Sequence, residues 1–255
     1  MKILNEFVLS VFAYAKGVRL IPKYNLFKYV ILLLLLVAVF VLPVLIIGKT
    51  SNFIASIIPY FETQKYAEIG TRFLASISGF FLLVVLIPVF SLVSAEVHQK
   101  LNNEKSSFSL QQFTIDVIRG IKITFRNLFY QYGVLLLIVI GLKFLPTSAV
   151  FSILGKVILF LTTSYFYGFS MMDYAMENNK MNYKKSIAFM RSHIGLGIGI
   201  GSIYYSVIII NKLKIFQQTF GDIAIYWSVF AEAIIAFIGV IAANIVMKAI
   251  LKKQF

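Results

Sequence analysis

Long stretches without a charged residue alternate with short polar segments along this chain of 255 residues. Two of these stretches, 29–48 and 73–95, are 20 and 23 residues long. At a rise of about 1.5 Å per residue, a helix of that length crosses the hydrocarbon core of a bilayer. Four further stretches follow, the last interrupted once by Glu232: 127–142, 157–172, 192–211 and 223–247. The pattern predicts an all-α polytopic membrane protein with about six membrane-embedded segments.

The third and fourth stretches are shorter than a full span. Each has 16 residues, which corresponds to about 24 Å of helix. Lys143 and Lys156 lie between them. Either these lysines extend to the headgroup layer, or the pair forms a hairpin that enters the bilayer without crossing it. Both arrangements stay open, as does whether the segments within 192–247 cross fully. We therefore expect two full spans followed by shorter helices that can be hemi-penetrating.

Composition agrees with a membrane protein, since 60% of the residues are apolar and only 13% are charged. The net charge is +14, but the basic residues stand between apolar stretches, as at lipid headgroups, which argues against nucleic-acid binding. The absence of cysteine excludes disulfides and thiol catalysis. His98 and His193 have no second ligand at metal spacing, and no catalytic motif is found. We expect no metal site, no cofactor and no enzyme activity.

The distribution of Lys and Arg predicts the orientation. The positive-inside rule places Lys- and Arg-rich segments in the cytoplasm. Of the 24 such residues, 17 lie in alternate connecting segments, namely 1–28, 96–126, 173–191 and 248–255. Both termini are therefore expected to be cytoplasmic. We expect one integral membrane domain, in which 1–28 is an interfacial lead-in and 29–255 forms the membrane bundle.

The N-terminal segment has the pattern of an interfacial helix. Over residues 3–15, apolar residues recur at helical spacing, and polar residues such as Glu6 and Ser10 fill the rest of the helical wheel. This pattern predicts an amphipathic helix that lies in the headgroup plane. A second interfacial helix is expected to begin after Ser109 and to precede the stretch 127–142.

Gly17, Val18, Arg19 and Leu20 follow the first amphipathic segment and form a candidate oxyanion site. A glycine that ends the helix frees backbone N–H groups, and the arginine two residues later can donate two parallel hydrogen bonds to an anion. The alternative is a helix-ending glycine followed by an arginine that binds lipid headgroups.

The densest polar cluster spans 173–180. Asp173 and Glu177 are four residues apart on one helical face, so their charges repel unless a cation lies between them. Nearby candidates for this cation are Lys180, Lys184 and Arg191. An ion-paired clasp of this kind would fix the loop, whereas the alternative is a solvated helix end on the cytoplasmic side.

Four glycines occupy every second position of the fifth stretch: Gly195, Gly197, Gly199 and Gly201. On a helix they form two overlapping Gly-x-x-x-Gly pairs, which allow another backbone to approach closely. The spacing predicts a packing face, either within the subunit or between subunits.

Glu232 lies inside the sixth stretch, ten residues after Asp222. That separation is about 15 Å along a helix, which places the carboxylate near the bilayer midplane. It should be protonated, paired or directed into a polar cavity, because a charge there is costly. Lys143 and Lys156 are the partners within reach. Glu232 either couples anion import to protons or faces water at the end of a shallow helix.

Three stretches carry a family resemblance: Ala15–Val30, Leu92–Pro146 and Met172–Arg191. In the third, six residues match a shared motif, namely Asp173, Tyr174, Asn178, Lys180, Lys184 and Arg191, and Glu177 stands where the motif has Asp. Together these stretches resemble the CysZ family, the bacterial sulfate-permease branch of the etoposide-induced protein 2.4 membrane proteins. The resemblance implies a multi-pass protein of the bacterial inner membrane that forms homo-oligomers and takes up sulfate. It also favours the anion site at Gly17–Leu20.

Two functions remain open at this point. The first is a passive or ion-coupled permease for sulfate or a related oxyanion, whose openings are surrounded by Lys and Arg that concentrate anions. The second is a non-transporting membrane scaffold or stress-related protein of the same family. The bilayer is the expected partner in both cases, and the oxyanion only in the first.

Overall fold

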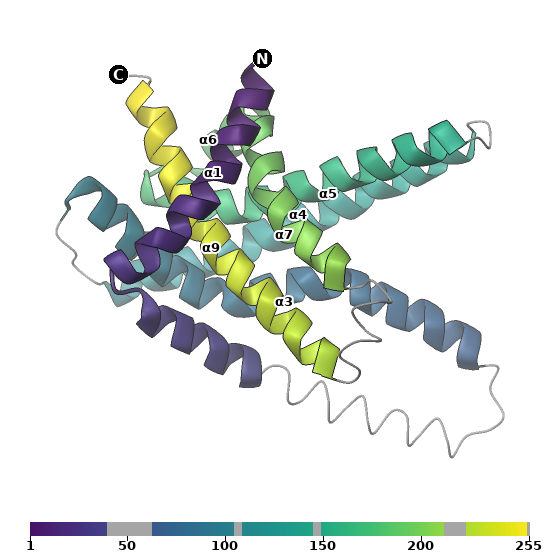
Figure 1. Ribbon diagram of the computed structural model, residues 1–255, viewed down its shortest axis with the longest axis horizontal. Helices are drawn as coiled ribbons and strands as arrows, with labels where there is room; N and C mark the ends of the chain where they lie inside the picture. Colours follow the sequence, from purple (N-terminus) through teal and green to yellow (C-terminus); the bar gives the residue numbers. More distant parts are fainter. Residues whose placement is uncertain (40–62, 105–108, 145–148, 212–222, 254–255) are drawn as a thin grey trace.

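The computed structural model describes residues 1–39, 63–104, 109–144, 149–211 and 223–253 (Figure 1). These ranges are helical and contain no strand, which confirms the all-α fold. Five of the described helices are long and apolar enough to cross a membrane, and two further helices, joined by a bend of 105°, give a sixth span if they are counted together.

The core is built around α9 (Ile223–Lys253) and α7 (Ile194–Asn211). Residues 236–244 of α9 are buried all round, as expected for a helix that is apolar on every face. The helices that pack against this central pair are α1 (Lys2–Lys23), α3 (Thr63–Asn102) and α5 (Ala149–Asn178). The remaining helices are Phe27–Val39, α4 (Leu110–Lys143) and α6 (Tyr183–Ser192). The expected first span, 29–48, is described only as far as Val39.

The N-terminal helix α1 differs from the prediction in length and in orientation. It continues to Lys23 instead of ending at Gly17, and its polar side is buried against α7. Glu6 pairs with His193 at 2.7 Å, and the Ser10 hydroxyl donates to the Leu196 carbonyl at 3.4 Å. An amphipathic helix that lies alone in the headgroup plane turns its polar side to water, whereas this side of α1 packs against α7. The interfacial position of the helix stays a prediction. The apolar side is exposed instead and is free to face lipid.

Helices α4 and α5 form an antiparallel pair that projects from the bundle (Figure 1). The separate interfacial helix and the 16-residue stretch predicted for α4 are one helix of 34 residues, and α5 has 30 residues. Counting charge-free residues underestimated both lengths, because each helix includes charged residues, and Arg119 of α4 and Asp173 and Glu177 of α5 are paired with one another. In the apolar segment that could cross a membrane, only 22% of the residues of each of these two helices are buried, against 56–61% in α3, α7 and α9. Most of the large exposed side chains on the pair are apolar and suit contact with lipid.

The two ends of the described chain lie on the same side of the molecule, which we call the terminal side (Figure 1). The four basic segments contact one another. Three hydrogen bonds to main-chain carbonyls join these segments in pairs: Lys100 to Tyr24, Arg119 to Met181 and Lys248 to Leu101. A fourth joins Lys2 to Ser192, the residue that follows the third segment. Their spatial grouping agrees with the orientation that the charge bias predicts, in which all four lie on the same side of the membrane.

Candidate functional site

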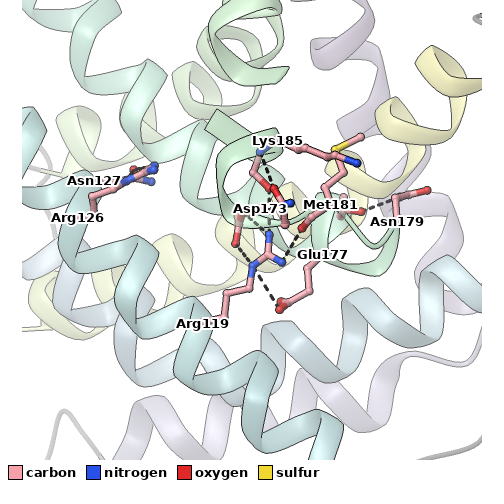
Figure 2. A network of polar contacts seen from close by, with 11 residues as sticks. Arg119, Arg126, Asn127, Asp173, Glu177, Asn179, Met181 and Lys185 are labelled. Carbon is pink, nitrogen blue, oxygen red and sulfur yellow. Dashed lines mark hydrogen bonds and ion pairs between the residues drawn. The ribbon is translucent and has the colours of Figure 1, made fainter. Parts of the chain in front are cut away.

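Two carboxylates of α5 hold one guanidinium of α4 on the terminal side (Figure 2). Arg119 donates from Nη2 to Oδ1 of Asp173 at 3.1 Å and from Nε to Oδ2 at 3.3 Å. Oε1 of Glu177, one turn further along α5, lies 3.4 Å from Nε. The Asp173 side chain is 4% exposed and that of Arg119 is 19% exposed. The ion pairs are therefore largely shielded from water, which strengthens them.

The same guanidinium also fixes the turn between α5 and α6. Lys180 has a φ of 56°, and its N–H and that of Met181 bond back to the last turn of α5, closing the helix with a Schellman motif. The turn places the Met181 carbonyl where Nη1 of Arg119 donates to it at 2.7 Å. Nη2 donates to the Ser186 hydroxyl at 3.0 Å. Arg119 thus connects α4, α5 and α6.

The cation between Asp173 and Glu177 is therefore not one of the three residues expected from the sequence. Lys180, Lys184 and Arg191 are all exposed, and the ion pairs are made by Arg119, 54 positions before Asp173. The sequence hypothesis considered only cations close to the carboxylates along the chain. The Arg119 side chain comes from α4, which packs against α5.

Two other residues of the 173–191 motif pack α5 against its neighbours. The Tyr174 ring meets Phe90 of α3 edge to face, with 5.9 Å between ring centroids. The Asn178 amide donates to the Ser94 hydroxyl at 2.8 Å. Ser94 also accepts a hydrogen bond of 2.8 Å from Asn244 of α9. Each of these contacts joins two helices, so Tyr174 and Asn178 help to hold α5 against α3.

A second arginine of α4 lines a separate pocket of about 180 Å³ between α4, α5 and α6. The Arg126 guanidinium lies 4.6 Å from the centre of the Phe169 ring and 5.0 Å from that of Tyr183. Its Nε and Nη2 donate to the Asn127 side-chain oxygen at 3.3 and 2.6 Å. The other residues lining the pocket are Tyr130, Tyr165, Phe166, Ile187 and Arg191. Sequence analysis missed this pocket, although Tyr183, Ile187 and Arg191 recur at the four-residue spacing of one helical face.

A larger cavity of about 770 Å³ opens between α3, α4 and α5. Its lining includes four carboxylates, those of Glu96, Glu104, Asp116 and Glu177, and three amines, those of Lys28, Lys100 and Lys180. Two of the amines are already paired with Glu96, at 2.8 and 2.7 Å. The charges nearly balance, so this cavity is polar without being selective for anions.

The candidate site at Gly17–Leu20 has a different geometry from the one expected. Gly17 lies within α1, so its backbone does not provide the N–H groups that a helix end would free. A Cβ at Gly17 would lie 3.4 Å from Ile238 of α9, so the glycine lies where the two helices come close together. Val18 and Arg19 are exposed and Leu20 is half-buried. Arg19 makes no hydrogen bond or ion pair with another described residue, so its guanidinium is open to a ligand.

The glycines of α7 face two different helices of the same chain. A Cβ at Gly195 or Gly199 would meet the backbone of α1, at Ile3 and Phe7. A Cβ at Gly201 would overlap the Ser164 carbonyl of α5, and one at Gly168 of α5 would overlap α7 in return. Gly197 lies against side chains of Tyr165 and Met190. The close approach is therefore within the subunit.

Glu232 lies in the core between α5, α7 and α9 and is 8% exposed. The Asn211 amide lies 3.4 Å from its Oε1. The Tyr167 and Tyr204 hydroxyls lie within range of its charge. Of the two expected partners, Lys156 is exposed, and the side chain of Lys143 lies outside the described residues. Polar side chains of α5 and α7 therefore lie near the carboxylate.

The described residues include no group of three or more His, Asp or Glu side chains that could hold a metal ion. The helices, the spans and the buried ion pairs define a polytopic helical membrane protein. The sequence model for the family described as sulfate transporter CysZ/etoposide-induced protein 2.4 matches residues 13–216, about four-fifths of the chain. The chain belongs to this family. A comparison with curated proteins gives no match.

Proposed function

We propose that the protein is a permease that carries sulfate or a related oxyanion across the bacterial inner membrane. The observation that supports it most is the family match over residues 13–216, which includes both Gly17–Leu20 and the 173–191 motif. The description of the family names both a sulfate transporter and etoposide-induced protein 2.4. A non-transporting scaffold is therefore the second candidate. The homo-oligomer implied by the resemblance stays a prediction.

Transport is tested with the purified full-length chain in liposomes. We expect labelled sulfate to enter these vesicles faster than protein-free vesicles, and unlabelled sulfate to compete with it. Uptake equal to that of the protein-free control, by protein that is folded and inserted, would favour the scaffold.

Arg19→Ala is expected to reduce sulfate uptake at least about tenfold, because a hydrogen bond to a charged group contributes roughly 1.5–3 kcal/mol. Arg19→Lys should restore only part of it, since an ammonium lacks the two-pronged geometry of guanidinium. Lys16→Ala, which removes an exposed charge from the same helix, is the matched control and should leave uptake near wild type. Wild-type uptake in both Arg19 variants would remove this residue from the anion path.

Glu232→Gln is expected to abolish any dependence of uptake on the pH gradient. We propose that Glu232 exchanges a proton during anion import, and its burial near polar side chains of α5 and α7 supports this role. Glutamine is nearly isosteric and cannot exchange a proton. Uptake is measured at a series of external pH values. A variant that keeps the wild-type pH profile would show that Glu232 is structural.

We also propose that the terminal side faces the cytoplasm, because it gathers the four basic segments. Alkaline phosphatase fused after Phe255 should be inactive, since the enzyme matures only in the periplasm, and a green fluorescent protein fused there should be bright. The opposite pattern would reverse the orientation.

A further inference from the structure

The two half-buried arginines of α4, Arg119 and Arg126, differ in how many of their N–H groups are occupied. Arg119 donates from all three of its nitrogens, to a carboxylate, a carbonyl and a hydroxyl. Arg126 donates only from Nε and Nη2, and both reach the same Asn127 oxygen. Three of its five N–H groups therefore have no acceptor in the described part of the chain. Arg126 is held in place by its contacts, and one edge of its guanidinium stays available.

A second arginine lines the same pocket. Arg191 of α6 also lines it, and it makes no hydrogen bond or ion pair with the rest of the described chain. Tyr165, which lines the same pocket, lies near both arginines. Among the described residues, no carboxylate lines this pocket, in contrast to the larger cavity. Two positive groups with free donors suit a tetrahedral anion such as a phosphate or sulfate group.

The surface beside the pocket is apolar. On α4, the residues that follow Arg126 along the same side include Phe129, Tyr130 and Leu137, with exposed fractions of 80%, 58% and 69%. They lie on the projecting α4–α5 pair, whose exposed surface suits acyl chains. A free ion makes no contact with such an apolar surface, whereas an anionic phospholipid needs a cationic site for its phosphate and an apolar strip beside it for its acyl chains.

We propose that the pocket between α4, α5 and α6 binds the phosphodiester of an anionic phospholipid, with Arg126 and Arg191 holding the phosphate oxygens and the acyl chains lying along α4. Basic pockets between membrane helices are a known way to hold such headgroups. The aromatic rings of Phe169 and Tyr183 keep the Arg126 guanidinium in place before the lipid arrives, which lowers the entropic cost of binding. This site is separate from the one proposed for the transported anion.

The test uses the delipidated full-length protein in a neutral detergent, with thermal unfolding as the readout and native mass spectrometry to count bound lipids. We expect phosphatidylglycerol to raise Tm more than phosphatidylcholine does at equal concentration. Arg191→Gln should weaken the binding of phosphatidylglycerol about tenfold, and this variant should fold because Arg191 is exposed. Arg126→Lys keeps the charge but loses the fork, and it should weaken binding as well. Lys184→Gln/Lys185→Gln removes two exposed charges from the same helix and should bind like wild type.

Three results would overturn the proposal. Equal stabilisation by the two lipids would show that no anionic headgroup is recognised. An equal loss in the Lys184→Gln/Lys185→Gln variant would indicate diffuse attraction instead of a pocket. Stabilisation by inorganic phosphate or sulfate alone, dependent on Arg126 and Arg191 and as large as that by phosphatidylglycerol, would assign the pocket to a free oxyanion. All three readouts are independent of whether the protein transports sulfate.

Discussion

Arg119→Ala is expected to lower the free energy of unfolding by about 3–5 kcal/mol, the usual cost of removing one partner from a buried ion pair. The variant leaves Asp173 and Glu177 facing each other four residues apart, without the cation between them. It also removes the donors for the Met181 carbonyl and the Ser186 hydroxyl. Thermal unfolding in detergent measures the loss, and the yield of monodisperse protein should fall with it.

The neighbouring residue Lys122 supplies the matched control, because it is an exposed cation on the same helix. Lys122→Ala should change stability by no more than about 0.5 kcal/mol. Arg119→Lys should lie between the two, since one ammonium cannot reach all the acceptors that the guanidinium bonds. If the Arg119→Ala protein unfolds at the same temperature as wild type, the network contributes nothing to the stability of the fold.

Local sequence pattern predicted that Asp173 and Glu177 need a cation, but it could not identify which one. The requirement follows from helical spacing alone, because residues four apart share a face. The identity of the cation depends on which helix packs beside α5, and this is set by contacts between residues dozens of positions apart. A search for arginine in every predicted helix would have included Arg119 without singling it out.

The helix α1 shows a second limit of such patterns. Its amphipathic spacing was evident, but the usual assignment of the polar side to water failed, because in a membrane protein lipid lies outside and polar groups pack inward. Glu6 and Ser10 are buried, whereas Leu4 and Phe12 are exposed. The apolar stretches predicted the membrane helices for a simpler reason. Hydrocarbon thickness fixes their minimum length whatever they pack against.

Gly168→Ala and Gly201→Ala are each expected to destabilise the protein by about 3 kcal/mol or more, at the upper end of overpacking costs. A Cβ at Gly168 would overlap the Gly197 carbonyl, and a Cβ at Gly201 would overlap that of Ser164. Both obstacles are backbone atoms, which cannot rotate away as a side chain can, so α5 and α7 must separate. Because the contact is within one subunit, the variants should lose stability of the fold itself, whatever their oligomeric state.

Two glycines of α4 test whether this effect comes from the interface or from glycine replacement in general. A Cβ at Gly133 or Gly141 would meet no described atom within 4 Å, and alanine has a higher helix propensity than glycine by about 1 kcal/mol. Gly133→Ala and Gly141→Ala should therefore raise the stability slightly or leave it unchanged. The decisive result is a lowered Tm for the Gly168 and Gly201 variants together with an unchanged or raised Tm for the Gly133 and Gly141 variants, all measured in the same detergent. If the Tm of Gly168→Ala equals that of Gly133→Ala, α5 and α7 do not pack as closely as the structure shows.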